Sequence, residues 1–461
     1  MQGNDIIAAI STPLGEGGIG IVRMSGPGAF RIALQVFDCP ACENSSFPEP
    51  RRLYHGYIRD REGQRIDEVL TAFMPAPHTY TREDIVEINC HSGILTLRII
   101  LKLVLENGAR LAEPGEFTRR AFINGRIDLS QAEAVMNIVR ARSEEAVHAA
   151  TRALQGELAG RINRIRDHII SLRAPLEAWF DYPEEYEDEF PGLDQLKGGL
   201  QQIREDINNL LQGVERDRAY QEGVSVAIIG RPNVGKSSLL NALLRQQRAI
   251  VHEIPGTTRD MLEGFMNLGG YPIRLVDTAG IQGTEDPVER EGIERSRAAA
   301  GLARLLIMVL DGSAPWTGED REIAMLRSPD QGLVIVLNKR DLGKKVSVDK
   351  LKELHPDAAI VETAAITGAG IDELEKAATE QLDSLLGIPT ESPAIVTIRH
   401  EEALKDALNS IDSAEQALET QPPELVSTEL HDAWTRLGEI TGDTVSEALL
   451  DKIFSEFCLG K

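Results

Sequence analysis

The 461-residue chain has few cysteines, no long apolar run and no excess of basic residues. Four cysteines in a chain of this length argue against a disulfide framework and fit a reducing compartment. The longest apolar runs, such as residues 305–310, are far too short to cross a bilayer. The first residues also lack the basic and apolar regions of an export signal. We therefore expect a cytoplasmic protein with no membrane partner and about two to four domains.

The formal net charge of −24 limits how this chain can contact nucleic acid. Proteins that bind by neutralising phosphates alone normally have a basic surface. Contact with RNA would therefore need a local basic patch or help from a partner. Three arginines in the first long helical pattern are one candidate patch, and a solvated helix face is the other interpretation: Arg161, Arg164 and Arg166.

Cys39 and Cys42 form a C-x-x-C pair within a segment rich in proline and serine. A zinc site would need a second pair of ligands, for which only Cys90 and His91 are at hand. A lone C-x-x-C is weak evidence for a metal or redox site. We therefore interpret the pair as two free thiols in a surface loop.

The hydrophobic patterning changes along the chain and predicts a multidomain α/β protein. Residues 1–120 alternate short strands and turns around one helical pattern, which is typical of an α+β domain. Residues 121–220 and 385–461 carry long helical patterns, which we expect to pack together as one helical domain. Residues 221–384 alternate strands and helices, as in a mostly parallel sheet, and we expect this domain to be inserted between the helical segments.

Residues 230–237 read G-x-x-x-x-G-K-S between a predicted strand and a predicted helix. The glycines let backbone N–H groups turn toward a phosphate, and the helix N-terminus adds positive potential. Lys236 can reach the β- and γ-phosphates and assist catalysis, and the Ser237 hydroxyl can bind Mg²⁺. The remaining expected nucleotide contacts in this P-loop are Asn233, Val234, Gly235 and Ser238.

A second motif, Asp-Thr-Ala-Gly, follows another predicted strand. An aspartate at this place can hold Mg²⁺ through water, and the glycine N–H can sense the γ-phosphate. Between this motif and the P-loop lies the polar loop 256–260, in which we assign Thr258 to the metal. The expected nucleotide contacts of the second motif are Asp277, Thr278, Ala279 and Gly280.

The sequence Asn-Lys-Arg-Asp follows an apolar strand and predicts the choice of base. The carboxylate of Asp341 can accept hydrogen bonds from the N1–H and 2-amino groups of guanine, which adenine does not offer. The order of the four motifs resembles the TRAFAC class of GTPases. The expected base contacts are Asn338, Lys339 and Asp341, with the fifth motif of that class at Thr363, Ala364 and Ala365.

Ras-like GTPases orient the attacking water with a glutamine directly after the second motif, whereas this chain has Ile281 there. Other groups must therefore assist hydrolysis. Asn233 could bind a monovalent cation in the place of an arginine finger, and Glu289 could orient the water. The alternatives are that Asn233 is a turn residue and Glu289 is a solvated helix carboxylate.

The chain ends in Cys-Leu-Gly-Lys and opens with PLGEGGIGIVRMSG at residues 13–26. Together with the central motifs, these segments resemble the MnmE (TrmE) family of tRNA-modifying GTPases over essentially the full length. The resemblance implies a folate-binding N-terminal α+β domain, a central helical domain and an inserted Ras-like G domain. It also implies that K⁺ activates the GTPase by pairing two G domains, with Glu289 as the residue that orients water. The K⁺ site would comprise Asn233 of the P-loop together with His252, Ile254 and Thr257. The last three belong to a nucleotide-contacting loop that adds Glu253, Pro255, Gly256 and Thr258.

The same resemblance implies a second site in the N-terminal domain for a 5-formyl- or methylene-tetrahydrofolate. Its expected contacts are Arg23, Glu83, Arg126 and Lys461, with arginine at position 126 where the family has lysine. Cys458 matches a cysteine proposed to act in the modification chemistry. The family forms homodimers through the N-terminal domains and a heterotetramer with a flavin-dependent partner, MnmG. Together they add an aminomethyl-type (carboxymethylaminomethyl) group to C5 of the wobble uridine of certain tRNAs.

Two other functions have some support in the sequence. Residues 15–20 fit the dinucleotide fingerprint G-x-G-x-x-G, but a strand pattern follows them rather than a helix, so we reject an NAD site. A GTPase checkpoint in ribosome assembly would share the nucleotide motifs. Such proteins usually carry an RNA-binding module or a second G domain, and this sequence has no second P-loop. The N-terminal segment and the terminal Cys-Leu-Gly-Lys therefore favour the tRNA-modifying enzyme.

Overall fold

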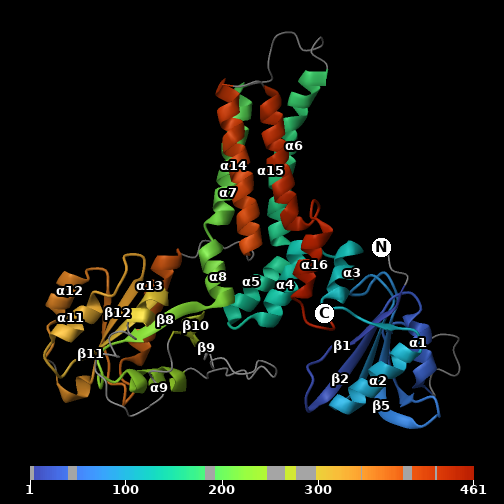
Figure 1. Ribbon diagram of the computed structural model, residues 1–461, viewed down its shortest axis with the longest axis horizontal. Helices are drawn as coiled ribbons and strands as arrows, with labels where there is room; N and C mark the ends of the chain where they lie inside the picture. Colours follow the sequence, from blue (N-terminus) through green and yellow to red (C-terminus); the bar gives the residue numbers. More distant parts are fainter. Residues whose placement is uncertain are drawn as a thin grey trace. The chain divides into compact units, whose positions relative to one another are not determined.

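The computed structural model describes residues 5–39, 49–181, 193–246, 265–276, 297–343, 345–387, 397–420 and 423–461. The chain forms two compact units (Figure 1). Unit 1 comprises residues 1–136 and 435–461, and unit 2 comprises residues 137–434. In the described ranges, no helix has the length and apolar character needed to cross a membrane.

Unit 1 is built on a seven-stranded sheet in the order β3-β4-β5-β6-β2-β1-β7. Neighbouring strands are antiparallel except β1 and β7, which are parallel. Alternate side chains enter a core shared with helices α1 and α2, as the period of two along a strand requires. The elements are β1 (Ile7–Ile10), β2 (Gly17–Ser25), α1 (Ala29–Val36), β3 (Phe37–Asp38), β4 (Leu53–Arg59), β5 (Arg65–Met74), β6 (Ile85–Ser92), α2 (Ile94–Glu106) and β7 (Arg110–Leu111).

The C-terminal segment of the chain belongs to unit 1. Helices α3 (Glu116–Ile123) and α4 (Leu129–Arg140) follow the sheet, and α16 (Glu447–Ser455) returns to them from the far end of the sequence. Phe454 and Phe457 pack in a separate apolar cluster with buried residues of α4. The C-terminus is therefore fixed within the same unit as the first strand.

The helical part of unit 2 combines segments from before and after the α/β block. Helix α14 packs along α7, and α7 packs on α6. Arg204 of α7 forms ion pairs with Asp412 and Glu415 of α14, which confirms that the two helical segments pack together. The helices are α5 (Glu144–Leu154), α6 (Glu157–Asp181), α7 (Leu193–Leu211), α8 (Val214–Glu222), α14 (Ile398–Thr420) and α15 (Pro423–Thr441).

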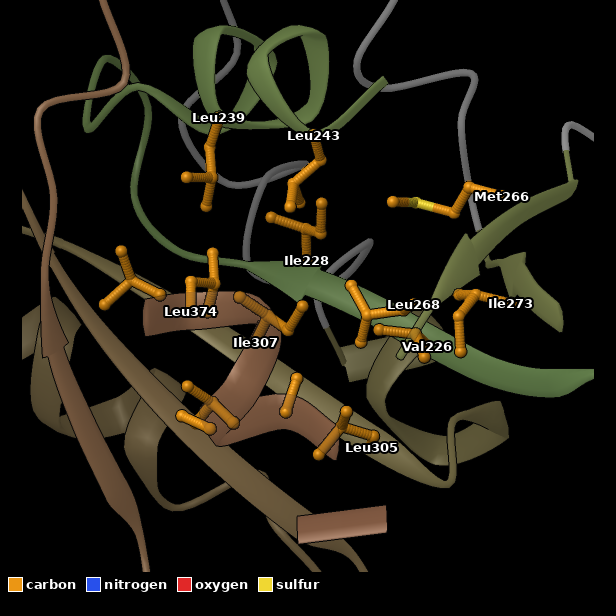
Figure 2. Packing of buried hydrophobic residues seen from close by; sticks show 14 of the residues in the cluster. Val226, Ile228, Leu239, Leu243, Met266, Leu268, Ile273, Leu305, Ile307 and Leu374 are labelled. Atoms are coloured by element: carbon orange, nitrogen blue, oxygen red, sulfur yellow. The ribbon is translucent and has the colours of Figure 1, made fainter. Parts of the chain in front are cut away.

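The remainder of unit 2 is a six-stranded sheet in the order β13-β12-β11-β8-β10-β9. Neighbouring strands are parallel except β9 and β10, which are antiparallel. Separate apolar cores lie on its two faces, and Figure 2 shows part of the core between the sheet and helices α9 and α13. The elements are β8 (Val224–Ile229), α9 (Lys236–Gln246), β9 (Phe265–Leu268), β10 (Tyr271–Leu275), β11 (Leu305–Asp311), α11 (Gly318–Ala324), β12 (Gly332–Asn338), η3 (Arg340–Leu342), α12 (Val348–Leu354), β13 (Ala359–Glu362) and α13 (Ile371–Leu386).

The predicted fold class is confirmed, because an α+β sheet unit, a helical bundle and a mostly parallel α/β sheet are all present. The interpretation of Cys39 as an exposed free thiol is wrong. Cys39 is buried in the core of unit 1 and takes part in a disulfide bond. Its apolar surroundings override the loop-like composition of the sequence around it. Cys42 lies outside the described residues.

Candidate functional site

The P-loop joins the end of β8 to the start of α9, as the sequence predicts. Asn233 has a φ of 64° and Gly235 a φ of 100°, so the backbone is left-handed at both positions. A Cβ on Gly235 would lie 2.2 Å from Nδ2 of Asn338, and only glycine fits there. The tight curl therefore depends on glycine at this position, which is what a phosphate-binding loop requires.

The side chain of Lys236 is hydrogen-bonded to the backbone of the P-loop. Its Nζ donates hydrogen bonds to the carbonyl oxygens of Gly230 and Arg231, each at 2.8 Å. Burial lowers the pKa of this amine. Ser237 and Ser238 are exposed in the first turn of α9. Two backbone carbonyls therefore hold the ammonium group beside the expected phosphate position.

Asn338 ties three of the predicted segments together. Its side chain is buried, and its Nδ2 donates to the carbonyl of Val234 at 2.9 Å. Its Oδ1 accepts hydrogen bonds from the N–H of Ala365 at 3.0 Å and from Oγ1 of Thr363 at 3.2 Å. The P-loop, the Asn-Lys-Arg-Asp segment and the Thr-Ala-Ala segment therefore meet at one side chain, which fits a common base-binding site.

Lys339 and Asp341 occupy the rim beyond Asn338. Lys339 has a φ of 63°, and its Nζ lies 2.7 Å from Oδ2 of Asp311 at the end of β11. Burial raises the pKa of the Asp311 carboxyl, but hydrogen bonds from Lys339 and Ser313 lower it more, so the net shift is downward. Asp341 is exposed in η3, where its carboxylate can meet a ligand.

Sequence reasoning missed two residues at this rim. Asp311 pairs in register with Asn338 across β11 and β12, and its place at a strand end was the available signal. Ile366 directly follows Ala365, and its side chain is 84% exposed beside the base-binding segments. The exposure of an isoleucine cannot be predicted from its sequence position, because only the fold shows that no other side chain covers it.

The other predicted parts of the nucleotide site lie outside the described residues. These parts are the loop of Thr258 and the proposed K⁺ ligands, the second motif and the residue expected to orient water. The residues concerned are His252, Glu253, Ile254, Pro255, Gly256, Thr257, Thr258, Asp277, Thr278, Ala279, Gly280 and Glu289. Their roles stay predictions. In the described ranges, no cluster of three or more metal-binding side chains is present.

In unit 1, the structure brings Arg23 to the C-terminus of the chain. The guanidinium pairs with Glu87 of the neighbouring strand at 2.7 Å, and its Nη1 donates to the carbonyl of Gly460 at 3.4 Å. It also lies over the ring of Phe117, 5.7 Å from the centroid. Lys461 follows Gly460 directly, so two predicted folate contacts from opposite ends of the sequence share one place.

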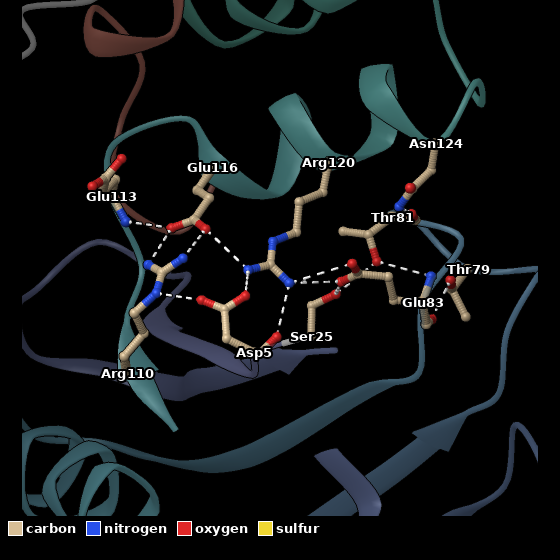
Figure 3. Close-up of polar contacts among 10 residues, drawn as sticks. All are labelled: Asp5, Ser25, Thr79, Thr81, Glu83, Arg110, Glu113, Glu116, Arg120 and Asn124. Carbon is tan, nitrogen blue, oxygen red and sulfur yellow. Dashed lines mark hydrogen bonds and ion pairs between the residues drawn. The ribbon is translucent and has the colours of Figure 1, made fainter. Parts of the chain in front are cut away.

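Glu83 belongs to a charged network that lies between helix α3 and the sheet (Figure 3). Its carboxylate accepts a hydrogen bond from the Ser25 hydroxyl at 2.8 Å and from Nη1 of Arg120 at 3.1 Å. Arg120 is buried and also donates to Asp5 at 2.8 Å and Glu116 at 3.1 Å. Sequence reasoning missed Arg120, because nothing in its helical context distinguishes it from an ordinary surface arginine.

Arg126 and Cys458 have fewer contacts with the proposed folate site than Arg23 and Glu83 have. The guanidinium of Arg126 lies over the Tyr80 ring, 4.7 Å from the centroid, and donates to the Tyr80 carbonyl at 3.1 Å. Tyr80 and Glu83 share one loop, so Arg126 is linked to the other predicted folate residues only through Tyr80 in the part of the chain that the structure describes. Cys458 is exposed with a free thiol, near Lys461 in sequence.

A P-loop on a mostly parallel sheet, joined through Asn338 to a base-specifying segment, defines a P-loop GTPase. Two family models match the chain. The model described as "MnmE helical domain" matches residues 129–458, and the model described as "GTP-binding protein TrmE N-terminus" matches residues 6–126. The chain belongs to the MnmE family of tRNA modification GTPases. It is therefore a GTP hydrolase, with GTP and Mg²⁺ as its nucleotide and metal.

Curated relatives named tRNA modification GTPase MnmE match along the whole chain. The protein of Alkaliphilus metalliredigens is 44% identical over 460 residues, covering 99% of each chain. That of Geobacillus thermodenitrificans is 45% identical over 465 residues, covering 99% of each, and that of Bacillus subtilis is 43% identical over 461 residues, covering 99% and 100%.

Among solved structures, the G domain of the T. maritima FeoB iron transporter is 29% identical over 34% of this chain and 98% of that one. Its TM-score is 0.26, which is too low to carry an argument. The family assignment therefore depends on the sequence relatives and the family models alone.

Proposed function

We propose that this chain is a K⁺-activated GTPase of tRNA wobble-uridine modification in the cytoplasm. With a flavin-dependent partner of the MnmG type, it uses the one-carbon unit of a tetrahydrofolate to add an aminomethyl-type group to C5. The observation that carries the proposal is that one chain holds both a GTPase site and, in unit 1, the convergence of Arg23 with the C-terminal Gly460. A pure timing switch has no need for the second feature.

Activation by K⁺ is proposed to use the P-loop and the loop that follows α9. Asn233 is exposed and in the left-handed conformation, so its side-chain oxygen is available at the rim of the P-loop. We assign K⁺ to Asn233, His252, Ile254 and Thr257, and Mg²⁺ to Ser237 and Thr258. Glu289 would orient the attacking water, because Ile281 cannot do so.

The folate is assigned to unit 1. Arg23, Glu83, Arg126 and Lys461 offer three cations and one carboxylate, which suit a ligand with carboxylate groups and a hydrogen-bonding ring. The residues present fit such a group, since Glu83 and Arg23 are both partly exposed. The buried Arg120 holds Glu83, and the half-buried Glu87 holds Arg23. The folate would supply the one-carbon unit, and Cys458 is exposed and free to act beside the site.

A homodimer is proposed to form through unit 1. The face of its sheet opposite α1 and α2 exposes Leu53 on β4 and Leu70 on β5, at 57% and 43%. Exposed apolar side chains on one sheet face are typical of a protein interface. Two copies of this chain with two flavin-dependent partners would give the heterotetramer.

The proposed domains are residues 1–120, 121–220, 221–384 and 385–461, and the second and fourth together form the helical domain.

The test is reconstitution with unmodified tRNA, GTP, KCl, methylene-tetrahydrofolate and a purified flavin-dependent partner of the MnmG type. Nucleoside mass spectrometry should show a modified wobble uridine that is lost when folate is omitted. Arg23→Ala should abolish modification while GTP hydrolysis continues. A chain that hydrolyses GTP but binds no folate and supports no modification would overturn the proposal in favour of a checkpoint GTPase.

A further inference from the structure

The second residue of the P-loop, Arg231, is tied to a buried carboxylate far along the chain. Its Nε donates to Oδ1 of Asp320 at 2.6 Å. The side chain of Asp320 is only 3% exposed, and that of Arg231 is 21% exposed. An ion pair with one member so deeply buried is costly to break, because a lone charge would be left in the interior.

The other carboxylate oxygen of Asp320 caps helix α11. Oδ2 accepts hydrogen bonds from the backbone N–H of Thr317 at 3.0 Å and from its hydroxyl at 2.9 Å, which completes the capping box of α11. The carboxylate is therefore shared between a helix cap and the P-loop. The cap can be weakened without removing Arg231, which allows the two roles to be separated.

The ion pair between Arg231 and Asp320 holds the part of the P-loop that binds Lys236. The carbonyl oxygens of Gly230 and Arg231 both accept hydrogen bonds from Nζ of Lys236. Gly230 is wedged against β11, since a Cβ there would lie 2.4 Å from the Val309 carbonyl. Asp320 thus fixes the beginning of the loop as Asn338 fixes its end at the Val234 carbonyl.

We propose that Arg231 and Asp320 are positioning residues for GTP binding, which hold the P-loop in its phosphate-binding shape before the nucleotide arrives. Neither needs to touch the base. A loop held in its bound shape loses less conformational freedom on binding, so loss of the pair weakens phosphate binding mainly through faster release. Discrimination between bases stays unchanged, because the base-binding segments keep their contacts through Asn338.

The experiment compares Arg231→Gln and Asp320→Asn with Thr317→Ala in the full chain. Thr317→Ala weakens the cap of α11 but leaves the ion pair. The release of fluorescently labelled GDP should be roughly tenfold faster in the first two variants and unchanged in the third. The preference for GDP over IDP, which lacks the 2-amino group, should equal that of the native chain in all three. Thr317→Ala should lower only the Tm, by about 2–4 °C.

Native release rates in Arg231→Gln and Asp320→Asn, with a fall in Tm alone, would overturn the positioning role and leave a structural ion pair. A loss of the preference for GDP over IDP would also overturn it, since the effect would then reach the base. If Arg231→Gln does not fold, Asp320→Asn decides the question, because asparagine leaves no buried charge and can still cap α11. None of these readouts depends on folate, K⁺ or tRNA.

Discussion

Nη1 of Arg23 donates a hydrogen bond to the carbonyl of Gly460, although 437 positions of sequence separate the two residues. Gly460 has a φ of 88°, and a Cβ there would lie 2.5 Å from the backbone carbonyl of Ile10. The C-terminal segment therefore enters a place beside β1 and β2 that only glycine can occupy. This position of Gly460 brings Lys461 to the proposed folate site.

Gly460→Ala should displace Lys461 and weaken folate binding roughly tenfold or more, since both the left-handed φ and the Ile10 contact disfavour a side chain. GDP affinity should stay native, because the G domain makes no use of Gly460. The measurement is calorimetric titration with 5-formyl-tetrahydrofolate and, separately, with GDP. Native folate affinity in this variant would show that Lys461 does not contribute to the site.

Asn338→Ala should lower GDP affinity by roughly a hundredfold. The substitution leaves the Ala365 N–H, the Thr363 hydroxyl and the Val234 carbonyl without their buried partner, and each such loss costs about 1–3 kcal/mol. Thr363→Val is the matched control, because it removes only one of these hydrogen bonds and keeps the side-chain shape. A similar loss of affinity in both variants would contradict the bridging role of Asn338.

The placement of the P-loop and of the Asn338 segment was predictable from sequence, whereas the contacts that support them were not. Short motifs specify local backbone shape, so the P-loop and the segment of Asn338 could be placed from spacing alone. Asp311, Arg120 and Asp320 act through partners that only tertiary packing brings near. The error at Cys39 has the same cause, because composition predicts a loop but does not show that its first residue enters the core.

The charged network of unit 1 should make its stability depend on pH. Burial raises the pKa of Glu116, but hydrogen bonds from Arg110, the Glu113 backbone and Arg120 lower it more, to a net value below the ordinary 4.5. A carboxyl with a lowered folded-state pKa stabilises the fold above its unfolded-state pKa. That stability is lost as the pH falls through the folded-state pKa. The native unit should therefore lose protection below about pH 4.5, and Glu116→Gln should show a flatter dependence.

Hydrogen exchange followed by mass spectrometry of peptides from β1 and α3 measures this difference at each pH. Arg120→Ala serves as the severe case, since it removes the buried guanidinium that Asp5, Glu83 and Glu116 share, and it should cost about 3–5 kcal/mol. Parallel pH profiles in the native chain and Glu116→Gln would show that the network does not set the acid sensitivity of unit 1.

The two free cysteines among the described residues should react at very different rates with a thiol reagent at pH 8. Burial and the nearby charge of Asp67 raise the pKa of Cys90 to about 11, so only about one thiol in a thousand is ionised. Cys458 is exposed and should label first. Cys458→Ser should remove the fast phase, and Cys90→Ser should leave it intact. Rapid labelling that persists in Cys458→Ser would contradict the burial of Cys90.

The most direct measurement is the steady-state rate of GTP hydrolysis in KCl and in NaCl at equal ionic strength. Glu289→Ala is assayed in parallel, with Glu291→Ala as the neighbouring carboxylate control. K⁺ should raise the rate at least roughly tenfold, since it would supply the charge that an arginine finger provides elsewhere. Glu289→Ala should bind GTP but lose turnover, and Glu291→Ala should not. Equal rates in both salts, or native turnover without Glu289, would contradict cation-dependent G-domain activation.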